Sequence, residues 1–430
     1  MPILVNDGAA DRVISPEEQR HHLQTALESI ADRPRKVLLV PPDISRKHSQ
    51  AGPLAVMAYE LLGPDVQVNV MPAIGTHFAM TDDEIATMFG DTIPRDRFLD
   101  HDWRNGVESV GVIPSALVAE WSDGGVNYDI EVSVDRELIH GGYDLVLSLG
   151  QIVPHEVVGM ANYSKNIIVG LGGADLINRS HYLGSVHGAE RTMGRIDTPV
   201  RRILNYALHE FLGTLPIWFV FTVMELDTGT GKLNMRGMYV GDDDETFASG
   251  ARLSQQVNLN LLEQPLHKIV VYLEADEFKS TWLGNKAVYR TRMAIADGGE
   301  LLVLAPGLRE FGEDRTIDAL LRKYGYPGTP ETIALVAQDE DLGNCLGAAA
   351  HMMHGSSEGR FSITYCPGEA MGREEIESVG YLYADLGEML ERYPPDQLDE
   401  GFNTMPDGEE IYFISNPALG LWALQSDFPG

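Results

Sequence analysis

Short runs of apolar, often β-branched residues alternate with segments of helical periodicity through the N-terminal part of the chain. Such near-continuous runs indicate strands that are buried on both faces, as in a parallel sheet covered by helices. The predicted strands are residues 37–40, 66–74, 144–152, 166–170, 217–226 and 268–275. The predicted helices are residues 81–89, 198–212, 244–262 and 286–296. The first of these helices opens with TDDE, which has the spacing of a capping box.

The same alternation restarts in the C-terminal part of the chain. Strands are predicted at residues 300–306, 360–366 and 410–415, and helices at residues 316–324 and 332–351. We therefore predict an α/β protein with two α/β domains and largely parallel sheets, residues 1–275 and residues 276–430, with their boundary near residues 275–283. The active site is expected in the cleft between the two domains.

The charge balance narrows the classes of partner. The chain has 32 Lys and Arg against 64 Asp and Glu, a formal net charge of −32, which argues against nucleic acid or an anionic membrane as partner. The longest apolar run, near residues 215–224, is too short to span a bilayer, and the start of the chain lacks the pattern of a signal peptide. Cys345 and Cys366 show no zinc spacing. We expect a cytoplasmic protein without a structural zinc, and association into a homo-oligomer is left open.

Polar side chains follow three of the predicted strands. These are Asp43, Ser45 and Arg46 after the first strand, Thr76 and His77 after the second, and His155 after the third. In open α/β sheets, ligands bind beyond the carboxyl ends of the strands. If the sheet is parallel, all of these residues lie at one edge, which is therefore the predicted site.

The stretch after residue 155 adds a lysine and further histidines. Lys165 lies in an apolar setting, which lowers the pKa of an amine and favours a nucleophilic or covalent role. His77 and His155 suit acid–base work, and the guanidinium of Arg46 suits a carboxylate or phosphate. Each residue alone also has a structural interpretation: a histidine at a strand end is more often a hydrogen-bonding group, and a lone lysine more often a surface residue. The GLGG motif does not complete a dinucleotide fingerprint.

Three motifs together resemble the nickel-dependent lactate racemase (LarA) family and its hydroxyacid racemase and epimerase relatives. PPDISR looks like the PPDxTR element of that family, GTHFAMTDDE like GxHRxMTxxE, and VPHEVVGMANYSK like PHxxAGxSGGRK. The resemblance implies that His77 and His155 are the catalytic histidines, that Lys165 holds the cofactor and that His181 is the metal ligand. It further implies that residues 1–275 carry these groups and that residues 276–430 close over the substrate.

The resemblance also implies the cofactor and the reaction. Members use the nickel-pincer nucleotide, a pyridinium-3,5-bisthiocarboxylic acid mononucleotide that carries Ni and is made by dedicated cofactor-biosynthesis enzymes. One histidine removes the hydroxyl proton of a 2-hydroxy acid, the C2 hydride passes to the cofactor and back through a 2-keto acid, and the other histidine reprotonates the product. Arg46 would bind the substrate carboxylate, with Asp43 and Ser45 near the cofactor phosphate. The chain is thus predicted to be an isomerase.

Two departures from the family bear on the substrate and on the cofactor. ANYSK replaces SGGRK, so both glycines and the arginine before Lys165 are lost. YRTRM replaces the YQxxK element of the C-terminal domain: Tyr289 is kept as a cofactor contact, and Arg290 and Arg292 become substrate-side candidates. We therefore expect a 2-hydroxy acid other than lactate. The alternatives are an α/β enzyme that uses NAD or another nucleotide, and a non-catalytic two-domain protein that binds a small acid.

Overall fold

The computed structural model describes residues 3–29, 33–227 and 232–428. The chain divides into two compact units. The first unit comprises the described residues up to Leu183 and those from Thr192 to Asn258; the second comprises Gly184–Arg191 and the described residues from Leu259 on. The units divide after residue 258, whereas the sequence predicted a domain boundary at residue 275. In addition, the short segment Gly184–Arg191 belongs to the second unit.

The first unit is built on a six-stranded sheet with the order β1-β10-β9-β6-β2-β3. Its strands are β1 (Val5–Gly8), β2 (Lys36–Val40), β3 (Gln67–Val70), β6 (Leu145–Gln151), β9 (Ile217–Asp227) and β10 (Lys232–Gly241). The four strands from β9 to β3 run parallel, while β10 and β1 are antiparallel additions at one edge. Two small antiparallel pairs complete the unit: β4 (Val107–Ile113) with β5 (Ile130–Asp135), and β7 (Pro154–His155) with β8 (Gly159–Met160).

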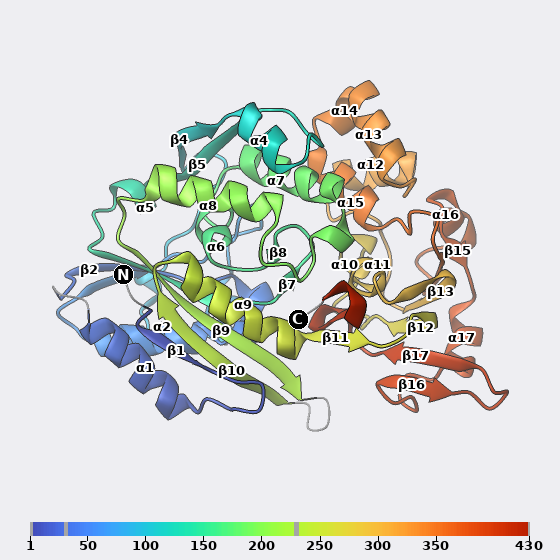
Figure 1. The fold of residues 1–430 in the computed structure, drawn as a ribbon, viewed down its shortest axis with the longest axis horizontal. Helices are drawn as coiled ribbons and strands as arrows, with labels where there is room; N and C mark the ends of the chain where they lie inside the picture. The colour runs from blue at the N-terminus through green and yellow to red at the C-terminus, as the bar shows by residue number, and fades with distance from the viewer. Residues whose placement is uncertain (1–2, 30–32, 228–231, 429–430) are drawn as a thin grey trace. The chain divides into compact units, whose positions relative to one another are not determined.

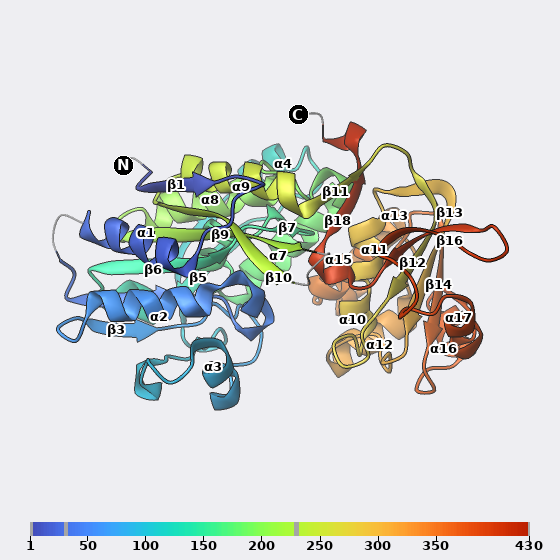
Figure 2. The same cartoon turned by 90° about the horizontal axis from the view of Figure 1, so that it is seen from below.

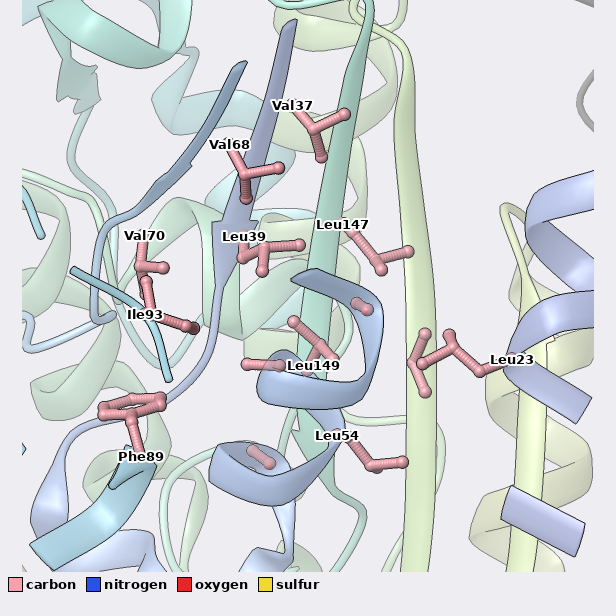
Figure 3. Close-up of a cluster of buried hydrophobic side chains, with 14 of the residues drawn as sticks. Leu23, Val37, Leu39, Leu54, Val68, Val70, Phe89, Ile93, Leu147 and Leu149 are labelled. Atoms are coloured by element: carbon pink, nitrogen blue, oxygen red, sulfur yellow. The ribbon is translucent and has the colours of Figure 1, made fainter. Parts of the chain in front are cut away.

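Helices cover both faces of this sheet (Figures 1 and 2). On one face, α1 (Pro16–Glu28), α2 (Ala51–Leu62) and α3 (Asp82–Phe89) bury a cluster of aliphatic side chains from alternate strand positions, among them Leu39 and Leu147 (Figure 3). On the other face, α9 (Asp244–Asn258) brings Phe247 against Phe221 of β9. The further helices of the unit are α4 (Ser115–Trp121), α5 (Arg136–His140), α6 (Ser164–Ile168), α8 (Pro199–Leu212) and, continuing into the second unit, α7 (Ala174–His187).

The second unit has its own six-stranded sheet with the order β15-β14-β13-β12-β17-β16, parallel except for the last pair. Its strands are β12 (Leu266–Tyr272), β13 (Ile295–Ala305), β14 (Ser362–Pro367), β15 (Leu382–Tyr383), β16 (Gly401–Thr404) and β17 (Glu410–Ile414). A separate parallel pair joins β11 (Leu259–Leu262) to β18 (Leu421–Leu424). Its helices are α10 (Thr281–Gly284), α11 (Lys286–Thr291), α12 (Arg315–Tyr324), α13 (Thr329–Gln338), α14 (Glu340–Gly343), α15 (Leu346–His354), α16 (Arg373–Ser378) and α17 (Leu386–Arg392).

The predicted fold class is confirmed: the protein is α/β, and both of its large sheets are mainly parallel. The prediction of a strand at residues 166–170 is wrong, because these residues belong to α6 and the turn after it. The periodicity of a short apolar run does not distinguish a buried strand from a buried helix.

Among the described residues, no helix combines the length and the apolar character needed to cross a membrane.

Several predicted helices end earlier than the hydrophobic pattern suggested. The helix predicted to end at residue 262 ends at Asn258 and continues as β11, and the one predicted at residues 286–296 ends at Thr291 before β13. The helix predicted at residues 332–351 is three helices, α13 to α15. The capping box before α3 is confirmed, with Thr81 and Glu84 bonded to each other's backbone amides.

Candidate functional site

The topology of the first sheet brings the three predicted polar clusters together. Strands β6, β2 and β3 are parallel neighbours, so their carboxyl ends meet at one edge of the sheet. Asp43 follows β2, His77 follows β3 and His155 follows β6. The electrostatic influence of Arg46, Lys165 and His181 on the pKa of His155 shows that these groups also lie near this edge. The edge is the candidate active site.

Asp43 and His77 form the first part of the site. Asp43 is buried and caps the short helical turn Ile44–Ser49, accepting a bond from the backbone amide of Ser45 at 3.1 Å and another from the Ser45 hydroxyl. Its Oδ2 lies 2.7 Å from Nδ1 of His77, whose side chain is exposed. Burial by itself raises the pKa of Asp43, but the bonds from His77 and Ser45 and the charge of Arg46 outweigh it, so the pKa falls. Asp43 is therefore ionised and holds the proton of His77 on Nδ1, leaving Nε2 as the basic atom.

His155 has the opposite arrangement. It is buried in the β7–β8 hairpin, and its Nδ1 accepts a bond from the backbone amide of Val157 at 3.1 Å. Burial lowers the pKa of His155 well below the usual value, and the positive charges of Lys165, Arg46 and His181 lower it further, while Glu156 opposes them. His155 is thus neutral, with its proton on Nε2. One imidazole is poised to accept a proton and the other to donate a hydrogen bond.

The segment between His155 and Lys165 follows a constrained path. Gly159 has a φ of +85°, and a Cβ atom there would lie 2.1 Å from the carbonyl oxygen of Arg195. Asn162 and Tyr163 are also left-handed, with φ of 73° and 58°, although neither is glycine. A left-handed residue with a side chain costs roughly 1–2 kcal/mol. The lactate racemase motif has glycines at these two positions, whereas this chain adopts the left-handed conformation there with residues that have side chains.

Lys165 opens the first turn of α6 and is half-buried. Burial lowers its pKa to about 8, assisted by the charges of Arg46 and Arg201 and opposed by Glu156 and Asp43. An appreciable fraction of the amine is therefore neutral near neutral pH and can act as a nucleophile. The next residue, Asn166, donates from Nδ2 to the carbonyl of Val40 and to the hydroxyl of Ser148, both at 2.9 Å. These bonds tie α6 to the last residue of β2 and to the middle of β6, and so place Lys165 near the carboxyl end of β2.

His181 lies on α7 with the properties of a metal ligand. Its Nδ1 donates to the carbonyl of Ile177 at 2.6 Å, which places the lone pair of the ring on Nε2. Burial lowers its pKa to about 4, and the charge of Lys165 lowers it further, so the ring is neutral at pH 7 and has the form that coordinates metal. In the part of the chain that the structure describes, no three His, Cys, Asp or Glu side chains converge as a metal site. A metal held by His181 would therefore need donors other than these side chains.

The predicted residues of the C-terminal half lie in the second unit. Tyr289 and Arg290 are buried in α11, and Arg292 directly follows that helix. Nε of Arg292 donates to Glu190 at 2.6 Å, and Arg292 lines a cavity of about 260 Å³ within this unit, together with Ser185, His354 and Glu358. Their roles toward cofactor and substrate stay predictions.

Two residues at the site were missed in the sequence. Asn166 was placed in the wrongly predicted strand, so its bonds to β2 and β6 were not foreseen. Arg201 of α8 is buried and binds the segment before Lys165. The ordinary amphipathic pattern of this helix did not indicate that Arg201 belongs to the site. The proline and the Thr cap at the start of the helix indicated only where the helix begins.

Fold and site together define an α/β protein with two histidines, a lysine of lowered pKa and a metal-type histidine at the edge of a parallel sheet. Residues 18–194, which include all of these groups, match the family model described as the lactate racemase N-terminal domain. In this region the chain is similar to the N-terminal domain of lactate racemases.

Solved structures show the same fold along nearly the whole chain. A crystal structure of a protein from Thermotoga maritima is 21% identical, with a TM-score of 0.79, and the alignment covers 97% of this chain and 99% of that one. The lactate racemase apoprotein from Thermoanaerobacterium thermosaccharolyticum is 16% identical, with a TM-score of 0.68, and covers 97% and 94% respectively. A comparison with curated protein sequences gives no match.

The close approach at Gly159 predicts a specific loss of stability. Gly159→Ala should lower the free energy of unfolding by roughly 2–5 kcal/mol, because it adds a contact with the carbonyl of Arg195 to the cost of a left-handed alanine. Gly90→Ala is the matched control, since Gly90 has a φ of +67° but nothing within 4 Å of its Cβ position. Calorimetry of both variants measures the difference; equal losses would show that the contact at Gly159 is easily relieved.

The lowered pKa of His155 predicts how stability changes with pH. In the unfolded chain this histidine takes up a proton as the pH falls through about 6.5, whereas the folded protein resists it, so the free energy of unfolding must fall below that pH. His155→Gln should make this fall shallower, by up to about 1.4 kcal/mol per pH unit. Urea unfolding between about pH 7 and 5 measures it. His21→Gln, at an exposed position of α1, is the matched control; a slope in His155→Gln equal to that of wild type would mean that His155 is protonated in the fold.

Proposed function

We propose that this chain is a racemase or epimerase of a 2-hydroxy acid other than lactate, acting with a nickel-pincer nucleotide. The observation that carries this proposal is the pairing of a basic Nε2 on His77 with a protonated Nε2 on His155, at one edge with Lys165 and His181. Inversion of a carbinol carbon needs a proton acceptor and a proton donor that serve opposite faces of a planar intermediate. A protein that only binds an acid has no need of two differently protonated imidazoles.

The residues present fit the nickel-pincer nucleotide. His181 offers a neutral ring with its lone pair on Nε2, and Lys165 offers an amine with a pKa of about 8. Arg46, Lys165 and Arg201 supply positive charge around the site, which suits a phosphate. When bound, the group would accept the C2 hydride of the substrate and return it. His181 would hold its metal, and Lys165 would anchor it.

The remaining steps belong to side chains of this chain. Arg46 binds the substrate carboxylate, and its exposed position after β2 leaves the guanidinium accessible to solvent. His77 takes the hydroxyl proton at Nε2, and the carboxylate of Asp43 stabilises the resulting imidazolium through Nδ1. His155 donates from Nε2 to the substrate oxygen. The negative charge of a bound acid raises the pKa of His155, so that the ring takes up a second proton from solvent when substrate is present, gives the Nε2 proton to the substrate oxygen and returns to its neutral form.

The glycines of GLGG are explained without a nucleotide. Cβ atoms at Gly170, Gly172 and Gly173 would lie 2.2, 2.0 and 2.2 Å from Asn166 O, Ile168 O and Ser133 Oγ, so these glycines serve close packing around the end of α6. The motif is incomplete as a dinucleotide fingerprint, and its glycines therefore lend no support to the alternative of an NAD-using enzyme.

Racemisation in deuterated water tests the proposal. The protein, co-expressed with the enzymes that synthesise the cofactor, is incubated with a panel of enantiopure 2-hydroxy acids, and products are examined by chiral chromatography and mass spectrometry. We expect inversion without deuterium at C2, and a loss of roughly 10²–10⁴-fold in His77→Gln and in His155→Gln. Deuterium at C2 would indicate a carbanion in place of hydride transfer. Cofactor-loaded protein that turns over no acid but still binds one after His77→Gln would establish the binding protein instead.

A further inference from the structure

Arg201 is a buried cation, and every hydrogen bond of its guanidinium to the described residues goes to one short segment, Met160–Ser164. Only 3% of its surface is exposed. Nη2 donates to the carbonyl of Met160 at 2.5 Å, and Nη1 donates to the carbonyl of Asn162 at 3.1 Å and to the hydroxyl of Ser164 at 2.8 Å. None of these acceptors is a carboxylate, and burial lowers the pKa of Arg201 to about 9. Burying a charge on neutral oxygens is expensive, so the fold keeps Arg201 at a cost.

The segment that Arg201 binds is the one that leads into Lys165. It contains the left-handed residues Asn162 and Tyr163, which stand where the lactate racemase motif has glycines. Non-glycine residues persist in this conformation only where their surroundings enforce it. Arg201 donates to the carbonyl of Met160, which precedes this pair, and to the carbonyl of Asn162, the first residue of the pair. The ring of Tyr163 stacks on that of Phe247, with the ring centroids 5.3 Å apart.

A second link fixes the far end of the segment. The hydroxyl of Ser164 accepts from Arg201 and donates to Oδ1 of Asn205 at 2.6 Å, and Asn205 in turn donates to Asp244 at 3.0 Å. Ser164 occupies the position of the arginine in the family motif. In this chain the guanidinium that binds the segment belongs to α8.

We propose that Arg201 is a positioning residue, which holds Met160–Ser164 in its left-handed turn and thereby presents the amine of Lys165 to the ligand of the site. The planar fork of arginine is suited to this task because it reaches three oxygens in a fixed geometry, whereas a lysine ammonium offers no such plane. The proposal rests on the proposed function for the identity of that ligand. The presentation of Lys165 itself is measurable without cofactor or turnover.

The test is the reactivity of Lys165 in otherwise unmodified full-length protein. The rate of its acetylation by a small activated ester is measured from about pH 6 to 10 by peptide mass spectrometry, relative to the exposed Lys279 of the same chain. Arg201→Met should move the midpoint of Lys165 to higher pH, because a like charge is lost, and slow acetylation near pH 8 by about fivefold or more. Arg201→Lys should fall between this variant and wild type. Arg202→Met, at the exposed neighbouring position bonded to Asp197, is the matched control and should behave as wild type.

If Arg201 acts by holding the left-handed turn, a glycine within that turn should partly compensate for the loss of Arg201. Adding Asn162→Gly to Arg201→Met should restore part of the Lys165 rate, because glycine adopts a left-handed conformation without strain. A folded Arg201→Met protein with the wild-type rate and midpoint would overturn the proposal. If Arg201→Met does not fold, Ser164→Ala decides: slower acetylation of Lys165 supports the proposal, and an unchanged profile overturns it. Neither result depends on racemisation, so the two proposals fail separately.

Discussion

The site depends on burying basic nitrogen atoms beside one another with little opposing negative charge. Lys165 and His181 have pKa values of about 8 and 4, and the pKa of His155 is also well below its usual value. In each case the largest cause is burial, and the neighbouring cations add to it. The result is a cluster of neutral or partly neutral donors at physiological pH. An exposed lysine would be fully protonated at this pH and would not act as a nucleophile.

Such a cluster requires a rigid scaffold, because charged groups move apart or into water where they can. Three parallel strands supply the edge, and Asn166 ties α6 to two of them. The approach to Lys165 is fixed by Gly159 and by two left-handed residues that have side chains. The strain in this turn and the buried charge of Arg201 are costs that sit directly beside the site, where strain is commonly maintained for function.

The sequence predicted the features that follow from local rules. Runs of apolar residues predicted the central strands. The polar residues that follow β2, β3 and β6 predicted the edge of the sheet at which these side chains meet. It could not predict what depends on contacts between distant residues. The run at residues 166–170 lies in α6 and the turn after it, where Asn166 bonds to β2 and β6, which are distant in the sequence. The antiparallel strands β1 and β10 were also not expected.

The losses of glycine and arginine in ANYSK illustrate the same limit. From the sequence, these changes suggested an altered cofactor pocket. In the structure, Asn162 and Tyr163 have positive φ values, and a guanidinium binds the segment from Arg201 of α8. Arg201 is distant from this segment in the sequence, so no motif could have shown the contact.

The central claim is that this edge holds a nickel cofactor through His181 and Lys165. The most direct measurement is intact-protein mass together with nickel content, for wild type and His181→Gln after co-expression with the cofactor-synthesis enzymes. The account predicts about one nickel per chain in wild type, a mass increment that maps to Lys165, and loss of nickel in His181→Gln. Wild-type protein with neither nickel nor increment, or a His181→Gln variant that keeps its nickel, would contradict it.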